Sequence, residues 1–328
     1  MTSMSRTAVT IRQFGGPEVM ALENELLAAP APGEARIRQT AIGFNYIDIY
    51  QRKGTYPLTL PSGLGHEAAG IVEAVGSGVS SVKVGDRVAY MNAGVGAYAD
   101  ARNVAADKLV VLPASVSDEA AATLLFKGMT AQYLIRRTYK VQSGDLLLVH
   151  TAAGGVGQIL TRWAKALGAT VIGTTSSSHK VAIAKAAGCD GVVNTSDPDW
   201  PKEFLKLTGG RKARAVYDAV GKDTFLQSLD CAAPFGLVAY YGAASGPAPA
   251  IEPDLLNKKG CLFLTRPSVF PHNADPETFR ANAADLFDAI ARGYVKVDIG
   301  QRAKLANIAQ VHEMAEQRKT NGAVLITP

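Results

Sequence analysis

Residues 152–157, A-A-G-G-V-G, have the small side chains and the spacing of a dinucleotide-binding loop. In such a loop Gly154 would let the backbone approach a pyrophosphate, and Gly157 would let a helix pack closely against a strand. The helix N-terminus would then offer unpaired N–H groups and a positive dipole end to the phosphates. Glycine loops also serve as plain turns, but here an apolar run (145–151) precedes the loop and a helical run (156–167) follows it. We therefore predict a nucleotide site.

The end of the next predicted strand bears on which nucleotide binds. In NAD-binding proteins an acidic residue there accepts hydrogen bonds from the ribose hydroxyls, whereas residues 173–180 read G-T-T-S-S-S-H-K. No carboxylate would repel a 2′-phosphate, and Ser176, Ser177 and Lys180 can donate hydrogen bonds to one. The alternative is that Lys180 is only a solvated lysine in the first turn of a helix. The pattern favours NADPH.

The composition is that of a folded protein with room for two domains. The chain has 328 residues, 47% of them hydrophobic, and a single core stops growing at about 250 to 300 residues. The 34 Lys and Arg against 29 Asp and Glu leave a formal charge of +5, without a basic run that would bind nucleic acid. This modest excess favours a small anionic ligand.

Targeting signals and disulfides are not expected. Residues 1–16 lack the apolar stretch of a signal peptide, and no later segment has about 18 uninterrupted apolar residues, so we expect a cytoplasmic protein. Cys189, Cys231 and Cys261 are widely spaced and form no Cys-x-x-Cys pair. We expect buried free thiols rather than a disulfide framework or a cysteine-based zinc site.

Two patterns divide the elements that must position these residues. Short β-rich runs separated by turn residues, from Thr7 to about Leu112, predict a compact β-barrel. From residue 145 to 265, unbroken apolar strands alternate with helices, which predicts a parallel sheet covered on both faces. The barrel strands are expected at 35–42, 68–75, 87–90 and 108–111, and a helix opened by the capping residue Ser117 is expected at 117–138. In the parallel sheet, strands are expected at 145–151 and 170–173, the alternation continues through 181–187, 192–194, 215–218, 225–232 and 237–241, and the last strand is expected at 261–265. Helices at 276–292 and 304–319 and a terminal strand at 323–327 are expected to follow.

Seven stretches together resemble the medium-chain dehydrogenase/reductase superfamily, and within it the zinc-independent NADPH:quinone oxidoreductases of the zeta-crystallin-like type. They are G-G-P-E-V-M (15–20), A-I-G-F-N-Y-I-D-I-Y (41–50), L-P-S-G-L-G-H-E-A-A-G (60–70), F-K-G-M-T-A (126–131), H-T-A-A-G-G-V-G-Q (150–158), V-Y-D-A-V-G (216–221) and L-T-R-P-S (264–268). The resemblance extends over essentially the whole chain. It implies an α/β protein with a GroES-like β-barrel catalytic domain (1–125 and 266–328), a Rossmann NADPH-binding domain (126–265), a cleft between them, and a homodimer joined through the edge strands of the Rossmann sheets.

The resemblance also implies roles for individual residues. Asn45 and Tyr46 would lie near the nicotinamide, Thr130 would contact the cofactor, Gly155 and Val156 would sit under the pyrophosphate, Tyr241 and Gly242 beside the nicotinamide ribose, Thr265, Arg266 and Pro267 on the nicotinamide side, and Lys180 and Arg318 at the 2′-phosphate. One departure concerns Thr195, where relatives often have a tyrosine that reaches the adenosine phosphate. Its loss would weaken discrimination between NADPH and NADH without reversing it.

His66 stands where zinc-dependent relatives place an imidazole ligand. Such a zinc also needs two cysteines, but the first of these positions is Asn45, the F-K-G segment has no cysteine, and residues 90–98 lack a four-cysteine structural lobe. One imidazole cannot supply the roughly 10 kcal/mol that a full ligand set provides. We expect no metal, a hydrogen-bonded interior or cleft-lining His66, a Glu67 that supports local loop structure, and an Asn45 that hydrogen-bonds to the cofactor.

Without a Lewis acid the site is poorly suited to alcohol oxidation. A conjugated quinone can accept hydride directly if it is stacked on the nicotinamide, and donors near the developing phenolate would help. We nominate Tyr50 and Tyr56, in the loop after Asn45, and Arg266 as an anion stabiliser; each alternatively serves packing or the cleft wall only. The histidines, His150 among them, are scattered, and no serine has the context of a hydrolase nucleophile.

Two other functions stay open at this point. NADPH-dependent reduction of activated carbon–carbon double bonds, in enones or alkenals, shares the fold and the hydride donor. A non-catalytic role, as an RNA-binding or crystallin-like structural protein, belongs to another class, and the lack of basic clusters counts against RNA.

Overall fold

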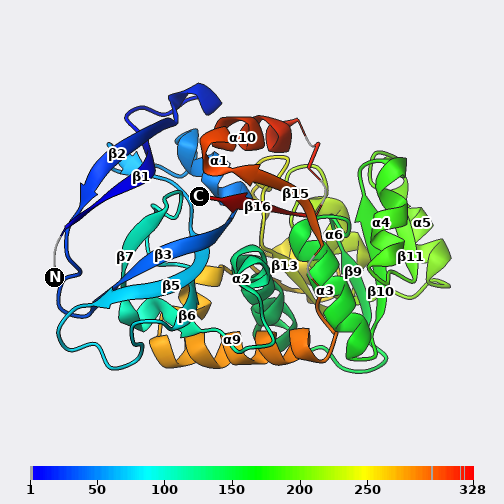
Figure 1. Ribbon diagram of the computed structural model, residues 1–328. Coiled ribbons are helices and arrows are strands. Elements are labelled where there is room, and N and C mark those ends of the chain that lie inside the picture. Colours follow the sequence, from blue (N-terminus) through cyan, green and yellow to red (C-terminus); the bar gives the residue numbers. More distant parts are fainter. Residues whose placement is uncertain (1–2, 297, 318, 321) are drawn as a thin grey trace. The chain divides into compact units, whose positions relative to one another are not determined.

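The computed structural model describes residues 3–296, 298–317, 319–320 and 322–328 (Figure 1). The chain divides into two compact units. Unit 1 comprises Met1–Met129, Asn273–Ala291 and Val297–Pro328, and unit 2 comprises Thr130–His272 and Arg292–Lys296. The chain passes from unit 1 to unit 2 within helix α2 (Asp118–Tyr133). Among the described residues, none of the helices has both the length and the apolar character that crossing a bilayer requires.

Unit 1 is mainly β-structure. Its other elements are β1 (Met4–Ile11), η1 (Pro17–Val19), β2 (Ala21–Leu27), β3 (Glu34–Gly43), α1 (Tyr46–Arg52), β4 (Ser62–Gly63), β5 (Glu67–Val75), β6 (Arg87–Tyr90), β7 (Ala101–Ala105), η2 (Ala106–Lys108), β8 (Leu109–Val111), α9 (Pro276–Ala291), β15 (Ile299–Lys304), η5 (Leu305–Asn307), α10 (Ile308–Glu316) and β16 (Ala323–Thr327). The strands form a sheet in the order β2-β1-β4 and a second sheet in the order β15-β16-β3-β5-β6-β8, with β7 also paired to β3.

One hydrophobic cluster joins the sheets of unit 1 to its helices. Ile37 of β3 and Val88 of β6 belong to this cluster, together with Ile49 of α1 and Val311 of α10. Because Ile49 is buried among strand residues, the cluster fixes α1 against the sheet. The residues next to it along α1 are thereby held in place.

Unit 2 contains six parallel strands in the order β11-β10-β9-β12-β13-β14. Its elements are η3 (Leu134–Thr138), β9 (Leu146–Val149), α3 (Gly155–Ala166), β10 (Thr170–Thr175), η4 (Ser178–Lys180), α4 (Val181–Ala186), β11 (Gly191–Asn194), α5 (Trp200–Leu207), β12 (Ala213–Asp218), α6 (Phe225–Cys231), β13 (Ala232–Tyr240), α7 (Asp254–Lys258), β14 (Phe263–Thr265) and α8 (Val269–His272). All four residues of β9 are buried. Since successive strand residues face opposite sides, both faces of the sheet are covered, as predicted.

Several predicted elements are confirmed. The strands predicted at 87–90 and 323–327 coincide with β6 and β16. The helix predicted at 117–138 corresponds to α2 followed by the π-helical turn η3. Ser117 acts as the expected cap, because its Oγ accepts a hydrogen bond from the Ala120 N–H at 3.1 Å.

Other expectations were wrong or incomplete. The helix predicted from residue 304 begins at Ile308, because residues 299–304 form the strand β15. Cys189 and Cys231 are buried free thiols, but Cys261 is exposed, in the turn that leads from α7 to β14. The elements α1, β1, β2, β4, β7, α5, α7 and α8 were not predicted.

Candidate active site

The predicted nucleotide-binding residues of unit 2 gather at one edge of its sheet. The glycine loop follows β9, Ser176 follows β10, Thr195 follows β11, Tyr241 follows β13, and Thr265 ends β14. All five positions are at the carboxyl ends of parallel strands. Open parallel sheets bind their ligands at this edge, so the topology brings together residues that are far apart in the sequence.

The glycine loop has the close packing that the fingerprint requires. Gly154 caps α3 with extended backbone (φ −81°, ψ 170°), and its N–H donates to Thr151 O at 2.8 Å. A Cβ on Gly157 would lie 2.2 Å from Thr151 O, so no side chain fits there. A Cβ on Gly154 would meet Thr151 at 3.0 Å, which is tight but not prohibitive. The 12-residue helix α3 thus begins directly at the loop, as a phosphate site needs.

The segment after β10 carries hydroxyl and basic groups. Ser176 is exposed and Lys180 half-buried, and His179 adds a second basic side chain beside Lys180. The neighbouring Thr195 binds this segment rather than pointing away from it, because its N–H and its hydroxyl both donate to Thr175 O, at 2.9 and 3.3 Å. Its short side chain therefore supports the loop, and the residues here suit a 2′-phosphate. Arg318 lies outside the described residues.

The other half of this carboxyl edge, at the ends of β13 and β14, contains residues expected near the nicotinamide. The N–H of Tyr241 donates to Asp218 O at 2.8 Å, and a Cβ on Gly242 would lie 2.6 Å from Ala219 O, so this turn is tightly packed. The Arg266 guanidinium lies over the ring of Tyr240, 4.6 Å from its centroid, which holds the cation by a cation–π contact. Pro267 follows it, buried, and Thr130 is buried in α2.

A buried polar network, missed from the sequence, supports this edge. The Ser228 hydroxyl donates to Asp218 Oδ2 at 2.8 Å and lies 2.9 Å from His150 Nε2. His150 Nδ1 lies 3.0 Å from Thr174 Oγ1, which ties the ends of β9, β10 and β12 together. Burial lowers the pKa of His150. This is a structural chain rather than a hydrolase triad, because the serine bridges the carboxylate and the imidazole.

In unit 1, Asn45 lies at the N-terminus of α1 and is 4% exposed. Its Oδ1 accepts a hydrogen bond from Lys127 Nζ at 2.9 Å, and its Nδ2 donates to Glu67 Oε1 at 2.8 Å. Glu67 is fully buried as the first residue of β5, so the expectation that it supports a loop was wrong. Neither Lys127 nor Glu67 was predicted to take part in the site.

Three tyrosines form a row that starts on α1. The rings of Tyr46 and Tyr50 meet edge to face with centroids 5.5 Å apart, and those of Tyr50 and Tyr56 do so at 5.4 Å. Tyr46 and Tyr56 are 42% and 40% exposed. Tyr50 belongs to α1 and not to a loop as expected, because Asn45 and Asp48 start a helix here. Tyr56 follows the helix.

His66 is an interior histidine with a hydrogen bond, as predicted. Its Nε2 lies 2.9 Å from Gln51 Oε1, and the residue is 5% exposed. Burial, and to a lesser degree the positive charge of Arg102, lowers the pKa of His66 to about 4, so the ring is neutral at pH 7. In the described part of the chain there is no group of three or more His, Cys, Asp or Glu side chains that could hold a metal ion.

A second buried network of unit 1 fastens α1 to α10. Tyr98 donates to Asp48 Oδ2 at 2.7 Å and lies 3.1 Å from His312 Nε2. His312 Nδ1 lies 3.2 Å from Arg52, which also pairs with Glu316 at 2.8 Å. Burial raises the pKa of Asp48 to about 7. The helix that carries Tyr46 and Tyr50 is therefore anchored at both ends.

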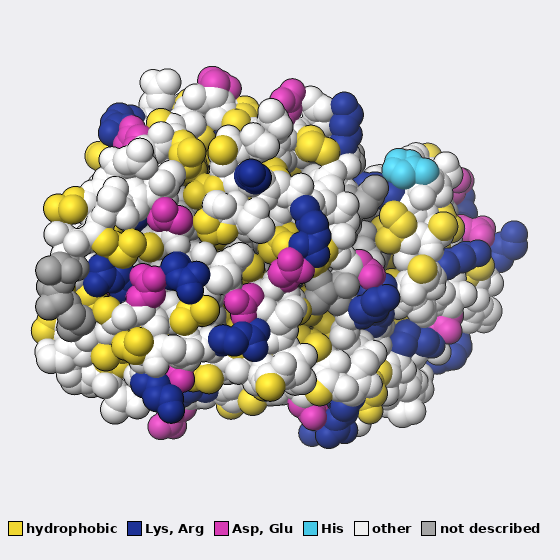
Figure 2. All heavy atoms as spheres, in the orientation of Figure 1, with side chains coloured by type: hydrophobic (Ala, Val, Ile, Leu, Met, Phe, Trp, Pro, Cys, Tyr) yellow, Lys and Arg dark blue, Asp and Glu magenta, His cyan; other side chains and the backbone are white. Residues whose placement is uncertain are grey.

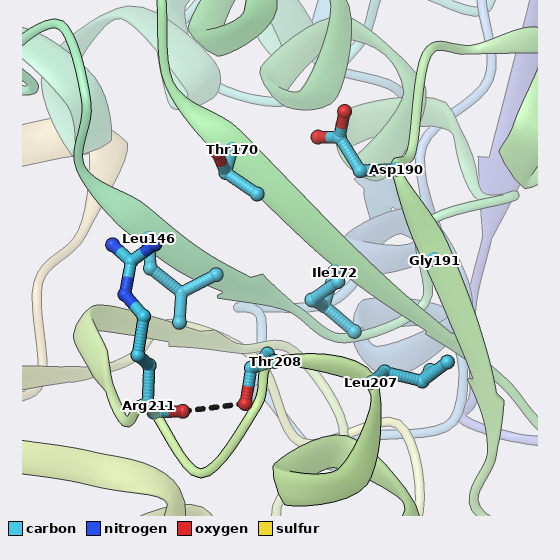
Figure 3. A pocket seen from close by; sticks show the side chains of 8 residues that line it. All are labelled: Leu146, Thr170, Ile172, Asp190, Gly191, Leu207, Thr208 and Arg211. Atoms are coloured by element: carbon cyan, nitrogen blue, oxygen red, sulfur yellow. Dashed lines mark hydrogen bonds between the residues drawn. The ribbon is translucent and has the colours of Figure 1, made fainter.

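A cavity of unit 2 is located elsewhere. It is lined by the first residues of β9, β10 and β11 together with Asp190, Ile172, Leu207, Thr208 and Arg211 (Figure 3). The lining strand residues Leu146, Thr170 and Gly191 mark the amino ends of their strands. The cavity is thus at the sheet edge opposite to the glycine loop and is not the nucleotide site.

Comparisons with known proteins agree with this geometry. The sequence matches two family models, "Alcohol dehydrogenase GroES-like domain" over residues 31–142 and "Zinc-binding dehydrogenase" over residues 155–288. It is 46% identical to the quinone oxidoreductase of Pseudomonas aeruginosa, over 96% of this chain and 97% of that protein. It is 40% identical to a 2-haloacrylate reductase from a Burkholderia species, over 98% of both.

The structure is similar to the crystal structure of Escherichia coli quinone oxidoreductase complexed with NADPH. The TM-score is 0.95 at 43% identity, with 98% of this chain and 100% of that chain covered. The predicted fold class, a GroES-like domain with a parallel-sheet Rossmann domain, is thereby confirmed.

Proposed function

We propose that the protein reduces quinones with NADPH. The chain belongs to the quinone oxidoreductase family of the medium-chain dehydrogenase/reductase superfamily. The family predicted from the seven motifs is thus confirmed. The observation that carries the cofactor choice is the segment Gly173–Lys180, which is free of carboxylates and lies beside the glycine loop at the carboxyl edge of the sheet. Bound NADPH would supply a hydride from its nicotinamide.

In this proposal, residues of the chain bind the cofactor and orient its nicotinamide. Gly154, Gly155, Val156 and Gly157 cradle the pyrophosphate, Ser176 and Lys180 donate to the 2′-phosphate with Thr195 behind them, and Arg318 is kept as a proposed phosphate ligand. On the nicotinamide side we assign Asn45, Tyr46, Thr130, Tyr241, Gly242, Thr265, Arg266 and Pro267. These assignments are supported by the strand ends that carry most of them. A 2′-phosphate held by a lysine gains charge-assisted hydrogen bonds that NADH lacks.

On the substrate side we propose Tyr50 and Tyr56 as hydrogen-bond donors to the developing phenolate, with Arg266 as an anion stabiliser. The tyrosine row supports this, because its edge-to-face contacts restrict the rings. The reaction needs no metal. Asn45 is engaged by Lys127 and Glu67, and His66 by Gln51, so the groups nearest to a zinc-ligand pattern already have partners within the protein.

The test compares acceptors with one preparation of enzyme. NADPH oxidation is measured with 1,4-benzoquinone, 9,10-phenanthrenequinone and a simple enone, before and after treatment with a chelator, together with elemental analysis for zinc. We expect quinone turnover that is insensitive to the chelator, in protein without stoichiometric zinc. Stoichiometric zinc with chelator-sensitive alcohol turnover would refute the proposal.

A second candidate is the reduction of activated carbon–carbon double bonds. The 40% identity to a 2-haloacrylate reductase over nearly the whole chain favours it. The same assay separates the two functions, since turnover of the enone alone would replace the quinone proposal by this one.

We also propose a homodimer formed through β14, the end strand of the six-stranded sheet. Phe263 on this strand is 62% exposed and Phe235 on β13 is 64% exposed, so an apolar surface accompanies the strand edge. Nucleic acid is not proposed as a partner, because the sequence has no run of basic residues. On the face shown in Figure 2, acidic and basic side chains are interspersed. A cytoplasmic location and the domain boundaries at 126 and 265 remain predictions.

A further inference from the structure

The ammonium group of Lys127 donates hydrogen bonds to three acceptors within the protein. Its Nζ donates to Phe44 O at 2.8 Å, to Asn45 Oδ1 at 2.9 Å and to Glu67 Oε1 at 3.2 Å. The side chain is only 12% exposed. Three acceptors match the three N–H bonds of an ammonium group, so Lys127 has no N–H bond left with which to bind a ligand.

We propose that Lys127 is a positioning residue that sets which way the Asn45 amide faces, and thereby which hydrogen bonds Asn45 offers to the cofactor. This inference rests on the proposed function, in which Asn45 contacts NADPH. Lys127 acts through Asn45 and touches neither cofactor nor substrate.

The amide has one favourable orientation. Its oxygen faces the Lys127 ammonium and its nitrogen faces the Glu67 carboxylate. A turn of 180° would set the amide N–H groups against the ammonium and the amide oxygen against the carboxylate, so both hydrogen bonds would be lost and replaced by repulsion. One N–H and one lone pair of the amide are committed in this way. The capping box of α1 directs the other lone pair of the Asn45 oxygen to the Asp48 N–H. The remaining N–H is therefore the group that Asn45 can offer to a ligand.

The charge of Lys127 also favours the ionised form of the buried Glu67 carboxyl group. Burial raises the pKa of Glu67, while the Lys127 ammonium and the Phe126 N–H oppose that rise. The carboxylate accepts from Phe126 N through Oε2 at 2.6 Å and from Asn45 through Oε1 at 2.8 Å. Loss of Lys127 alone would therefore leave a buried carboxylate without its counter-ion, which destabilises a protein whatever the role of the lysine.

A double variant separates orientation from charge. In E67Q/K127M the Phe126 N–H still needs an acceptor. The oxygen of the introduced glutamine amide therefore takes the place of Glu67 Oε2, and its nitrogen takes the place of Glu67 Oε1. That nitrogen would face Asn45 Nδ2, a second donor, so Asn45 must turn its oxygen toward the introduced amide. The pair is then neutral and hydrogen-bonded, but the Asn45 amide is reversed.

The experiment measures thermal midpoints and NADPH dissociation constants for wild type, K127M, E67Q/K127M and the control K83M, whose lysine is exposed. We expect K127M to lose both stability and affinity. In E67Q/K127M the midpoint should return most of the way to that of wild type, while NADPH affinity stays about five- to tenfold weaker, the worth of one hydrogen bond. K83M should match wild type in both measurements.

The outcome that overturns the inference is a double variant with wild-type NADPH affinity, since Lys127 would then only neutralise Glu67. A double variant that stays as unstable as K127M while the control is normal also counts against it, because the reversed hydrogen-bonded pair would not have formed. Binding is measured without an acceptor. Wild-type protein that binds NADPH but reduces no quinone therefore contradicts the proposed function alone.

Discussion

At the scale of single residues, Lys180 carries the proposed preference for NADPH. It is the half-buried lysine of the segment 173–180, which contains no Asp or Glu. We expect Lys180→Ala to weaken NADPH binding about ten- to a hundredfold, because a charge-assisted hydrogen bond contributes about 1.5–3 kcal/mol. NADH binding should change little. Fluorescence titration with both cofactors measures this, with Lys185→Ala, an exposed lysine of α4, as the control. Equal losses for both cofactors would remove Lys180 from the phosphate site.

Asp48 should make stability depend on pH. Burial raises its pKa from 3.8 to about 7 in the folded protein. Between these values the folded state keeps a proton that the unfolded state has released. The contribution of Asp48 to stability is therefore greatest below about pH 4 and falls as the pH rises to 7. The loss is on the order of 4 kcal/mol over that window. Above pH 7 it is complete.

The variant Asp48→Asn should remove this dependence. The side-chain oxygen of the introduced asparagine can still accept from the Asn45 N–H and the Tyr98 hydroxyl, as Asp48 Oδ2 does. The unfolding midpoint of wild type should therefore fall relative to that of the variant between pH 5 and pH 7, with no further relative change at pH 8. Parallel midpoints across this range would show that Asp48 does not titrate there.

At the residue scale, a sequence motif is visible where the packing of the backbone dictates the residue type. Gly157 has to be glycine because of the 2.2 Å approach to Thr151 O, and such a requirement leaves a visible motif. The roles of Lys127 and Asp48 left no comparable signal. Their partners Asn45, Glu67 and Tyr98 come from distant parts of the chain. Only the packed structure shows that these charged side chains are buried.

At the scale of elements, the loop between β9 and α3 contains two glycines with different roles: Gly157 allows close packing, and Gly154 allows the approach of the pyrophosphate. Gly157→Ala would drive a methyl group into Thr151 O and force α3 away from the strand. We expect a loss of about 1–3 kcal/mol, as for other overpacked sites, together with loss of NADPH binding.

Gly154→Ala is the matched comparison. Its methyl group would meet Thr151 at 3.0 Å, so the fold should be nearly unaffected while NADPH binding is impaired at the pyrophosphate. Thermal unfolding and NADPH titration of both variants check the distinction. A stable Gly157→Ala protein would contradict the packing argument.

Elements were predictable where one pattern dominates the sequence. Buried strands such as β9, with L-L-L-V, and capped helices such as α2 stand out. The helix α1 did not, because its seven residues, Y-I-D-I-Y-Q-R, include β-branched and aromatic types that favour strands. Its helical form comes from Asn45 and Asp48 at its start and from burial of Ile49. Tertiary contacts decided this segment.

At the scale of the whole molecule, the proposed homodimer is testable at β14. Phe263→Asp would place a charge on the exposed apolar edge, and we expect it to convert a dimer into a monomer of 34.4 kDa. Analytical ultracentrifugation measures the mass. Val84→Asp, at a residue 60% exposed in a turn of unit 1, is the control and should stay dimeric. Wild-type protein that sediments as a monomer would rule out the interface.

The fold as a whole was predictable because its two halves have different sequence periodicities and because seven motifs extend along the chain. The pairings that complete unit 1 were not. The resemblance implied that residues 266–328 share a domain with residues 1–125. The residues of β15 and β16 do not themselves indicate that these strands join the sheet of β3, since strand pairing over such separations leaves no local pattern.

That late pairing has a consequence for biosynthesis. Ile42 and Gly43 of β3 pair with Ile326 and Leu325 of β16, and all of unit 2 is encoded between them. During synthesis, all six strands of the unit 2 sheet have been made while the end of β3 at residues 42–43, beyond its pairing with β7, still lacks β16. During that interval the nascent chain exposes the unpaired end of a strand, the kind of surface that chaperones cover and at which aggregation can start.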